Sequence, residues 1–356
     1  MLRGSVDRVS LQGKALEGNA LGDPAERELI VYLPPSYHRE QGRAYPWLMV
    51  LTGYASTNAA LLNFKPWEPN FLERYERLLA AGCPEAILVL PDCFTRWGGS
   101  QYIDSASLGD YQRYLADDVL SFVESTYRTA GRREARGIVG KSSGGFGALR
   151  MGIDRPESFA VIGSHAGDCA FELTLRGRFA EVLPVYERHG GPAGFARFLE
   201  QQGAPRSQAE FHAVEMLALA AAYAPLADPG HVDGERERAL PLGELPVDPY
   251  TAQIHPEKWQ RWLAHDPLVR AEKQPNALKN ARLVFLDAGK SDEYGLQFGA
   301  RMLAQRLINS GVKVQHEEFE GGHMGTAFRY DASLPILLAA LDSASVPRTP
   351  SRNRPL

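Results

Sequence analysis

The sequence has few cysteines, no long apolar run and little net charge, and each shortage excludes a class of protein. The 356 residues include three cysteines, Cys83, Cys93 and Cys169. Because this number is odd and the spacing fits no zinc motif, we expect idle or buried thiols rather than a disulfide framework. The longest apolar run, residues 216–227, contains Pro225 and is too short to cross a bilayer, which takes about 20 residues.

The net charge and the first seven residues indicate which partners and which cell compartment to expect. The formal net charge of -4 argues against a nucleic-acid partner. Residues 1–7 do not build the apolar core of a signal peptide. We therefore expect a cytoplasmic protein that does not span a membrane, and we leave a homodimer open.

Short apolar runs alternate with helical patterns along most of the chain. The runs that predict strands are residues 28–35, 45–51, 86–90, 136–140, 159–165, 282–288 and 312–319. Several are apolar throughout, which is typical of strands buried on both faces. The pattern predicts an α/β fold with a mainly parallel central sheet and helices on both faces.

The alternation stops between about residues 168 and 275, where helical patterns dominate. Trp259 and Trp262 lie three residues apart there and are predicted to pack in a core. We expect a helical insertion within one domain, residues 1–344, over the carboxyl ends of the strands, where open α/β sheets bind ligands. The composition of residues 345–356 predicts a disordered tail.

A Gly-x-Ser-x-Gly motif, residues 140–144, stands between an apolar strand and a helical segment. A sharp strand-to-helix turn leaves no room for side chains two residues before or after its serine, and Gly140 and Gly144 meet that need. Ser143 fits less well, because Lys141 would then occupy the crowded site. The motif predicts Ser142 as nucleophile and the amide of Ser143 as an oxyanion donor, against the alternative of a Gly/Ser-rich loop without chemistry.

A serine nucleophile needs a base, and the base needs a group that holds it. His323 follows the last predicted strand beside glycines and is the predicted base. Asp292 follows the preceding strand and is the predicted acid, with Glu293 as the alternative. Asp287, nearer the strand, suits a loop-orienting role, and a helix cap is the alternative role of Asp292.

Other loops at the predicted strand ends supply the remaining candidates. The amide of Tyr54, after the strand that ends near residue 51, is the predicted second oxyanion donor. The substrate-binding candidates are Trp97, Ser100, Gln101, Tyr102, Lys141, His165 and Asp168, and for the aromatic loop and the His165 loop simple loop packing is an equal alternative. No metal-ligand spacing and no Gly-x-Gly-x-x-Gly fingerprint is found, so we expect no metal and no cofactor.

The chain resembles the putative esterase family of α/β-hydrolases, which includes esterase D (S-formylglutathione hydrolase), enterochelin esterase, feruloyl esterases and the mycobacterial mycolyltransferases. The resemblance is carried by residues 51–54, 90–92, 98–102, 140–145, 289–292 and 322–323, spread over about residues 28–340. It implies an α/β-hydrolase fold, a nucleophile, acid and base at Ser142, Asp292 and His323, and oxyanion donors at Tyr54 and Ser143.

Departures from the family pattern leave the substrate open. Members that hydrolyse S-formylglutathione usually have His and Met where this chain has Lys141 and Ser143, and the insertion is larger than compact members need. We expect a serine carboxylesterase that acts on a small-molecule ester through an acyl-enzyme. The alternatives are acyl transfer to an alcohol or sugar acceptor and, in another class, a non-catalytic binding module.

Overall fold

The computed structural model describes residues 2–226 and 243–341, so the predicted tail lies outside the described residues. Its main sheet consists of β1 (Ser5–Gln12), β2 (Glu26–Leu33), β3 (Trp47–Leu51), β4 (Ile87–Pro91), β7 (Arg136–Lys141), β8 (Val161–His165), β9 (Leu283–Gly289) and β10 (Val314–Phe319). A small second sheet pairs β5 (Asp104–Ser105) with β6 (Gly109–Asp110). The helices are α1 (Phe71–Ala80), α2 (Tyr111–Arg113), α3 (Leu120–Thr126), α4 (Ser143–Asp154), α5 (Phe171–Thr174), α6 (Phe179–Arg188), α7 (Pro192–Gln202), α8 (Gln208–Tyr223), α9 (Pro256–Leu263), α10 (Pro267–Lys273), α11 (Leu296–Asn309) and α12 (Arg329–Ala340).

The main sheet runs in the order β1-β2-β4-β3-β7-β8-β9-β10. All pairs from β4 to β10 are parallel, whereas β2 is antiparallel to both β1 and β4. This confirms the predicted mainly parallel sheet. The edge strand β1 has no counterpart among the predicted strands, because an edge strand with one half-buried face needs few apolar residues and leaves a weak pattern.

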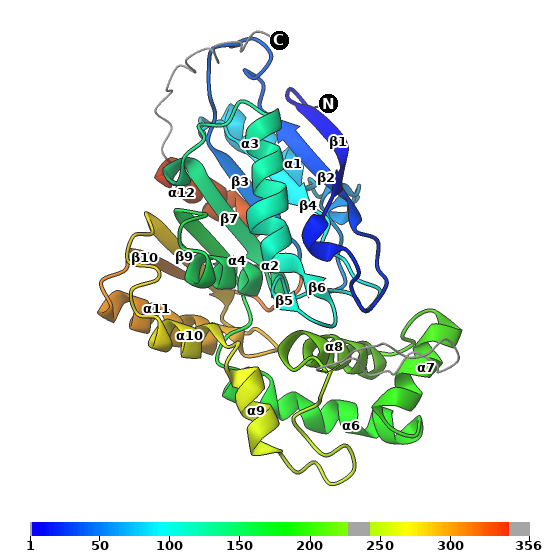
Figure 1. Cartoon of the computed structure of the whole chain (residues 1–356). Helices are drawn as coiled ribbons and strands as arrows, with labels where there is room; N and C mark the ends of the chain where they lie inside the picture. The colour runs from blue at the N-terminus through cyan, green and yellow to red at the C-terminus, as the bar shows by residue number, and fades with distance from the viewer. Residues whose placement is uncertain (1, 227–242, 342–356) are drawn as a thin grey trace, which may run out of the picture.

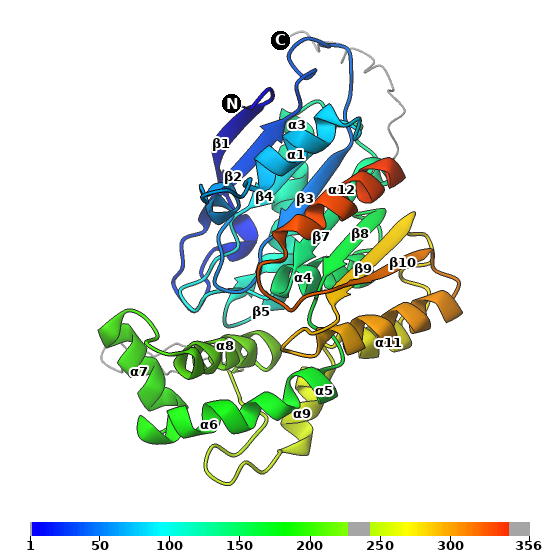
Figure 2. The same ribbon diagram turned by 180° about the vertical axis from the view of Figure 1, so that it is seen from behind.

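Helices cover both faces of the sheet (Figures 1 and 2). On one face, α2, α3, α4 and α11 pack their apolar side chains against the sheet in the largest core cluster. On the other face, α1 and α12 form a second cluster with the same strands. Strands β3, β4 and β8 are buried along their whole length, and β3 and β4 are also apolar throughout, which is typical of strands buried on both faces.

Helices α5 to α9 follow β8 and gather at one end of the sheet, with an apolar core of their own (Figure 2). Trp259 and Trp262 are 3% and 0% exposed, which confirms that they pack in a core. The ring of Phe146 on α4 stacks on Phe171 and contacts Tyr223, so the insertion core continues onto the helix after the Gly-x-Ser-x-Gly motif. The next helix, α10, instead packs against α4 and α11.

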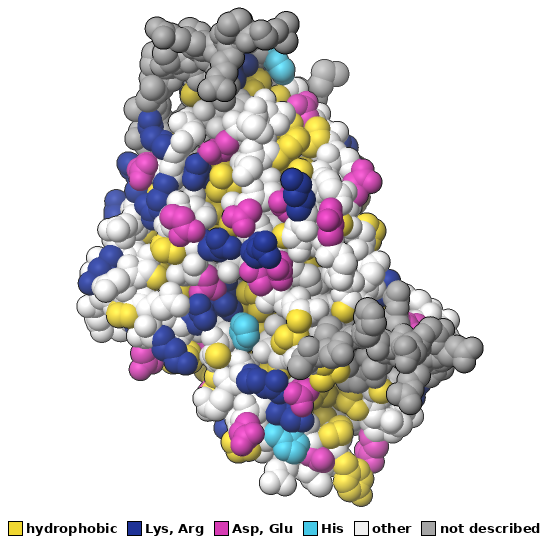
Figure 3. Space-filling view, viewed as in Figure 1, with side chains coloured by type: hydrophobic (Ala, Val, Ile, Leu, Met, Phe, Trp, Pro, Cys, Tyr) yellow, Lys and Arg dark blue, Asp and Glu magenta, His cyan; other side chains and the backbone are white. Residues whose placement is uncertain are grey.

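The scarce features of the sequence have simple structural counterparts. Cys93 and Cys169 are buried, Cys83 is partly buried, and all three are free thiols. Across the described ranges, we find no helix with both the length and the apolar character that crossing a bilayer requires. Acidic and basic side chains are interspersed on the face drawn in Figure 3, in keeping with the small net charge.

The insertion core generates a stability prediction. Trp262 lies against Phe179 and Tyr223, and its indole NH donates to the carbonyl oxygen of Glu244 at 3.2 Å. Trp262→Ala should lower the free energy of unfolding by about 3 to 5 kcal/mol, because it leaves a large cavity and an unpaired carbonyl. Trp67→Ala is the matched control, since Trp67 is fully exposed at 101%. Equal losses in chemical denaturation of the two variants would contradict this assignment.

Candidate active site

Ser142 occupies a strained turn between β7 and α4. Its backbone has φ 57° and ψ -123°, a conformation that non-glycine residues adopt only where the surroundings impose it. A Cβ atom on Gly140 would lie 2.4 Å from the backbone of Gly144, and one on Gly144 would lie 2.5 Å from the carbonyl oxygen of Leu51. Both positions therefore require glycine, as a nucleophile elbow does.

His323 and Asp292 complete a chain of hydrogen bonds that begins at Ser142. The Nε2 atom of His323 lies 3.0 Å from Ser142 Oγ, and its Nδ1 atom lies 2.8 Å from Asp292 Oδ2. The Asp292 side chain is 0% exposed, and its other oxygen accepts the amide of Tyr294 at 3.0 Å. With the Nδ1 proton held by this carboxylate, Nε2 is free to accept the serine proton.

Glu293, the alternative acid, has a different contact with the same histidine. Its carboxylate accepts the backbone amide of His323 at 2.6 Å. A Cβ atom on Gly322 would lie 2.4 Å from Glu293 Oε1, so glycine is what lets the loop approach this carboxylate. Asp292 thus contacts the imidazole ring, while Glu293 holds the backbone that carries it.

A second Ser-His-Asp arrangement is fully buried inside the fold. His165 Nδ1 is 2.7 Å from Asp287 Oδ1, and His165 Nε2 is 2.9 Å from Ser333 Oγ. These three residues are 4%, 1% and 0% exposed, so no substrate can reach them. Arg329 also donates to Asp287, at 2.8 Å, so this buried carboxylate is paired twice.

His165 therefore does not have the substrate-binding position that its sequence suggested, because both of its ring nitrogens are engaged inside the fold. Its carbonyl oxygen nevertheless accepts the amide of Ser142 at 2.8 Å. The sealed network thereby holds the end of β8 against the strained turn.

The two predicted oxyanion donors lie beside the serine with their amides free. Among the residues that the structure describes, neither the Ser143 amide nor the Tyr54 amide donates a hydrogen bond. A Cβ atom on Gly53 would be 3.5 Å from Ser142 Cβ, so the Tyr54 loop passes next to the serine side chain. Ser143 also begins α4, whose N-terminus favours negative charge.

The aromatic loop after β4 packs against the loop that carries Tyr54. The Tyr54 hydroxyl donates to the carbonyl oxygen of Trp97 at 2.6 Å, and the Tyr102 hydroxyl donates to that of Thr52 at 2.6 Å. Four predicted substrate-facing residues, Trp97, Ser100, Gln101 and Tyr102, are buried, and none lines the cavity that holds Ser142. Of these four, Trp97 and Tyr102 hold the Tyr54 loop through the two hydrogen bonds above.

A cavity of about 560 Å³ opens above Ser142 and His323. Of the predicted substrate-binding candidates, Lys141 and Asp168 line it. The insertion adds Arg178, Gln208, Phe211 and Glu215. These four escaped the sequence analysis because no motif marks them, and only the packing of the insertion brings them to the site.

Burial shapes the electrostatics of the cavity. It is the main cause that raises the pKa of Asp168 to about 7, with Glu215 adding to the rise and Arg178 opposing it. Arg178 pairs with Glu215 and lies over the ring of Tyr294 at 5.0 Å. Burial likewise lowers the pKa of Lys141. In residues 2–226 and 243–341, no three His, Cys, Asp or Glu side chains gather where they could hold a metal ion.

The sequence matches the family described as "Putative esterase" over residues 19–335. The chain belongs to the putative esterase family. Similar proteins include Esterase MT1326 of Mycobacterium tuberculosis strain CDC 1551 / Oshkosh and Esterase Rv1288 of strain H37Rv, each 30% identical over 327 residues. The alignments cover 89% of this chain and 56% of each relative, so the chain spans little more than half the length of these curated relatives.

Solved structures of esterases share the fold of this chain. A ferulic acid esterase aligns with a TM-score of 0.59 and 18% identity over 96% of this chain and 100% of its own. The S-formylglutathione hydrolase FrmB from Staphylococcus aureus aligns with a TM-score of 0.56 and 14% identity over 95% of this chain and 99% of its own. These alignments confirm the predicted α/β-hydrolase fold.

The raised pKa of Asp168 predicts a pH-dependent stability. An unfolded aspartate has a pKa of about 3.9, so the folded state binds this proton more tightly. The stability that the bound proton contributes is present below about pH 4, falls as the pH rises, and is lost once the pH passes about 7. Asp168→Asn should therefore stabilise the protein at pH 8 by up to about 2 kcal/mol, allowing for screening by water in the cavity. Denaturation curves should show this gain in the free energy of unfolding shrinking as the pH falls from about 7 toward about 4, the pKa of the unfolded aspartate. The exposed Asp117→Asn is the control, and a gain that does not vary with pH would contradict the assignment.

Proposed function

We propose that this protein is a serine carboxylesterase that hydrolyses a small-molecule ester with Ser142, His323 and Asp292. The observation that carries the proposal is the chain of two hydrogen bonds, 3.0 Å from Ser142 to His323 and 2.8 Å from His323 to Asp292. Ser142 and His323 line a cavity that a substrate can enter. Family membership supports the ester as the bond that is cleaved.

In the acylation step, His323 Nε2 takes the proton of Ser142 as Oγ attacks the ester carbonyl. The amides of Ser143 and Tyr54 then donate to the oxyanion of the tetrahedral intermediate. Asp292 stabilises the imidazolium that forms, and His323 passes the proton to the departing alcohol.

Deacylation repeats the same roles with water. His323 removes a proton from a water molecule, which attacks the acyl-enzyme carbonyl, and the proton returns to Ser142 Oγ. The ring of Tyr294 packs edge-on against His323, with centroids 4.9 Å apart, and so restrains the imidazole through both steps. The free acid leaves and the serine is restored.

The two Ser-His-Asp arrangements offer a matched test of the nucleophile. Ser142→Ala should lower kcat/KM for a 4-nitrophenyl ester by about a thousandfold or more. Ser333→Ala removes the serine of the sealed arrangement and should retain hydrolysis wherever the protein folds. A fluorophosphonate should label the wild type at one site, and peptide mapping should find the adduct on Ser142. Turnover by folded Ser142→Ala, or an adduct on another serine, would refute the proposal.

The same assay can distinguish the roles of the neighbouring acids Asp292 and Glu293. Asp292→Asn should reduce kcat by about a thousandfold or more, because an amide no longer holds the reactive tautomer of His323. Glu293→Gln keeps an oxygen that can accept the His323 amide and should reduce kcat by roughly tenfold at most. The reverse order of effects would make Glu293 the acid.

A further inference from the structure

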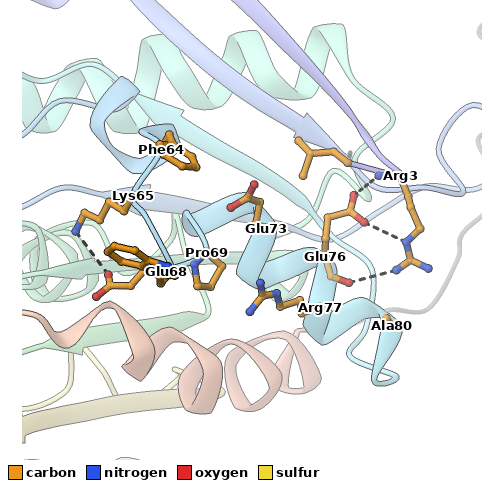
Figure 4. Close-up of a pocket in the computed structure, with 11 residues that line it drawn as sticks. Arg3, Phe64, Lys65, Glu68, Pro69, Glu73, Glu76, Arg77 and Ala80 are labelled. Atoms are coloured by element: carbon orange, nitrogen blue, oxygen red, sulfur yellow. Dashed lines mark hydrogen bonds and ion pairs between the residues drawn. The ribbon is translucent and has the colours of Figure 1, made fainter.

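Two lysines line the active-site cavity. Lys141 immediately precedes the nucleophile, and Lys65 lies on the turn before α1. Within the described residues, no hydrogen bond or ion pair engages the Lys141 ammonium. Lys65 approaches only Glu68 there, the contact drawn as a dashed line in Figure 4, at 4.0 Å. Both of these side chains are more than half exposed, at 65% and 59%. Such an exposed contact contributes little.

The two acidic groups whose charges act on Lys141 make their hydrogen bonds to His323. Asp292 is bonded to the His323 ring and Glu293 to the His323 amide. Their charges raise the pKa of Lys141, but burial lowers it more strongly, and the charge of Lys65 lowers it further. Lys65 and Lys141 both line the cavity, so their positive charges oppose each other there.

The other acidic and basic side chains that line the cavity are Arg178, Glu215 and Asp168. Glu215 on α8 pairs with Arg178, and Asp168 follows β8 near that pair. Three positive side chains of the lining thus face two carboxylates, and Lys65 and Lys141 are the two that pair with neither carboxylate. Like charges that face one cavity are stabilised when an anion enters between them.

We propose that Lys65 and Lys141 form a subsite for an anionic group of the ester substrate, a carboxylate or a phosphate. The inference rests on the proposed esterase function and narrows its substrate class to esters that carry a negative charge near the scissile bond. An ammonium group binds such an anion as a point charge with rotatable donors. Because Lys141 is the neighbour of Ser142, the anion would lie within a few bonds of the ester carbonyl.

Paired substrates that differ only in this charge test the subsite. Mono-4-nitrophenyl adipate against its methyl-capped diester places the charge in the acyl part. Acetoxybenzoate against its methyl ester places the charge in the alcohol part. The wild type should prefer the anionic member of one pair by roughly tenfold in kcat/KM at low ionic strength, and about 0.5 M salt should weaken this preference.

Lysine variants connect the preference to the subsite. Lys141→Met and Lys65→Met should each reduce the anionic-to-capped ratio of kcat/KM by roughly tenfold, while Lys65→Arg, which keeps the charge, should retain it. Lys279→Met removes an exposed lysine outside the cavity and should leave the ratio unchanged. Because the readout is a ratio within one variant, a general loss of activity does not imitate the effect.

Two results would overturn the subsite. The first is a wild type that hydrolyses the capped esters and shows no preference for either anionic partner, which leaves the esterase function standing. The second is a preference that neither lysine variant alters. A protein that turns over no ester and takes up no fluorophosphonate would instead refute the esterase function, and the subsite with it.

Discussion

The strained turn at Ser142 is the constraint on which the site depends. A serine at φ 57° is unfavourable in isolation, so the surroundings must impose it. They do so by close packing: Gly144 lies under the end of β3, and Gly140 lies against Gly144. The amide of Ser142 is held by the carbonyl oxygen of His165. The turn thus joins three parallel strands at their carboxyl ends, and the serine side chain projects where their loops converge.

The two Ser-His-Asp arrangements show that residue identity and hydrogen-bond distance do not by themselves make a catalytic site. The sealed set around His165 has distances of 2.7 Å and 2.9 Å, as short as those around His323. It lacks access, since Ser333 is 0% exposed. The free amides of Tyr54 and Ser143, in contrast, lie beside Ser142. Access and preorganised donors distinguish the set that can perform chemistry from the set that holds the sheet to α12.

The insertion and the lysines give the cavity its individual character. Helix α8 supplies Phe211 and Glu215 to the wall, and Arg178 pairs with Glu215 over Tyr294. This part of the cavity is charged but balanced. The excess of positive charge comes from Lys141, at the end of β7, and from Lys65, on the turn before α1. Under the proposed function, the hydrogen-bond chain from Ser142 to Asp292 supplies the chemistry, while the surrounding charges favour some esters over others.

The sequence by itself determined the α/β fold and the positions of the candidate triad, because tight turns and buried strands demand particular residues at fixed spacings. Gly140 and Gly144 leave no choice of side chain, and the order serine, acid, histidine follows from the strand order. It left Asp292 and Glu293 open, since adjacent residues on a loop can both reach a histidine. It could not tell that His165 is sealed, or that α8 walls the cavity. Those outcomes were decided by the tertiary structure alone, because they depend on packing between segments far apart in the chain, which no local pattern encodes.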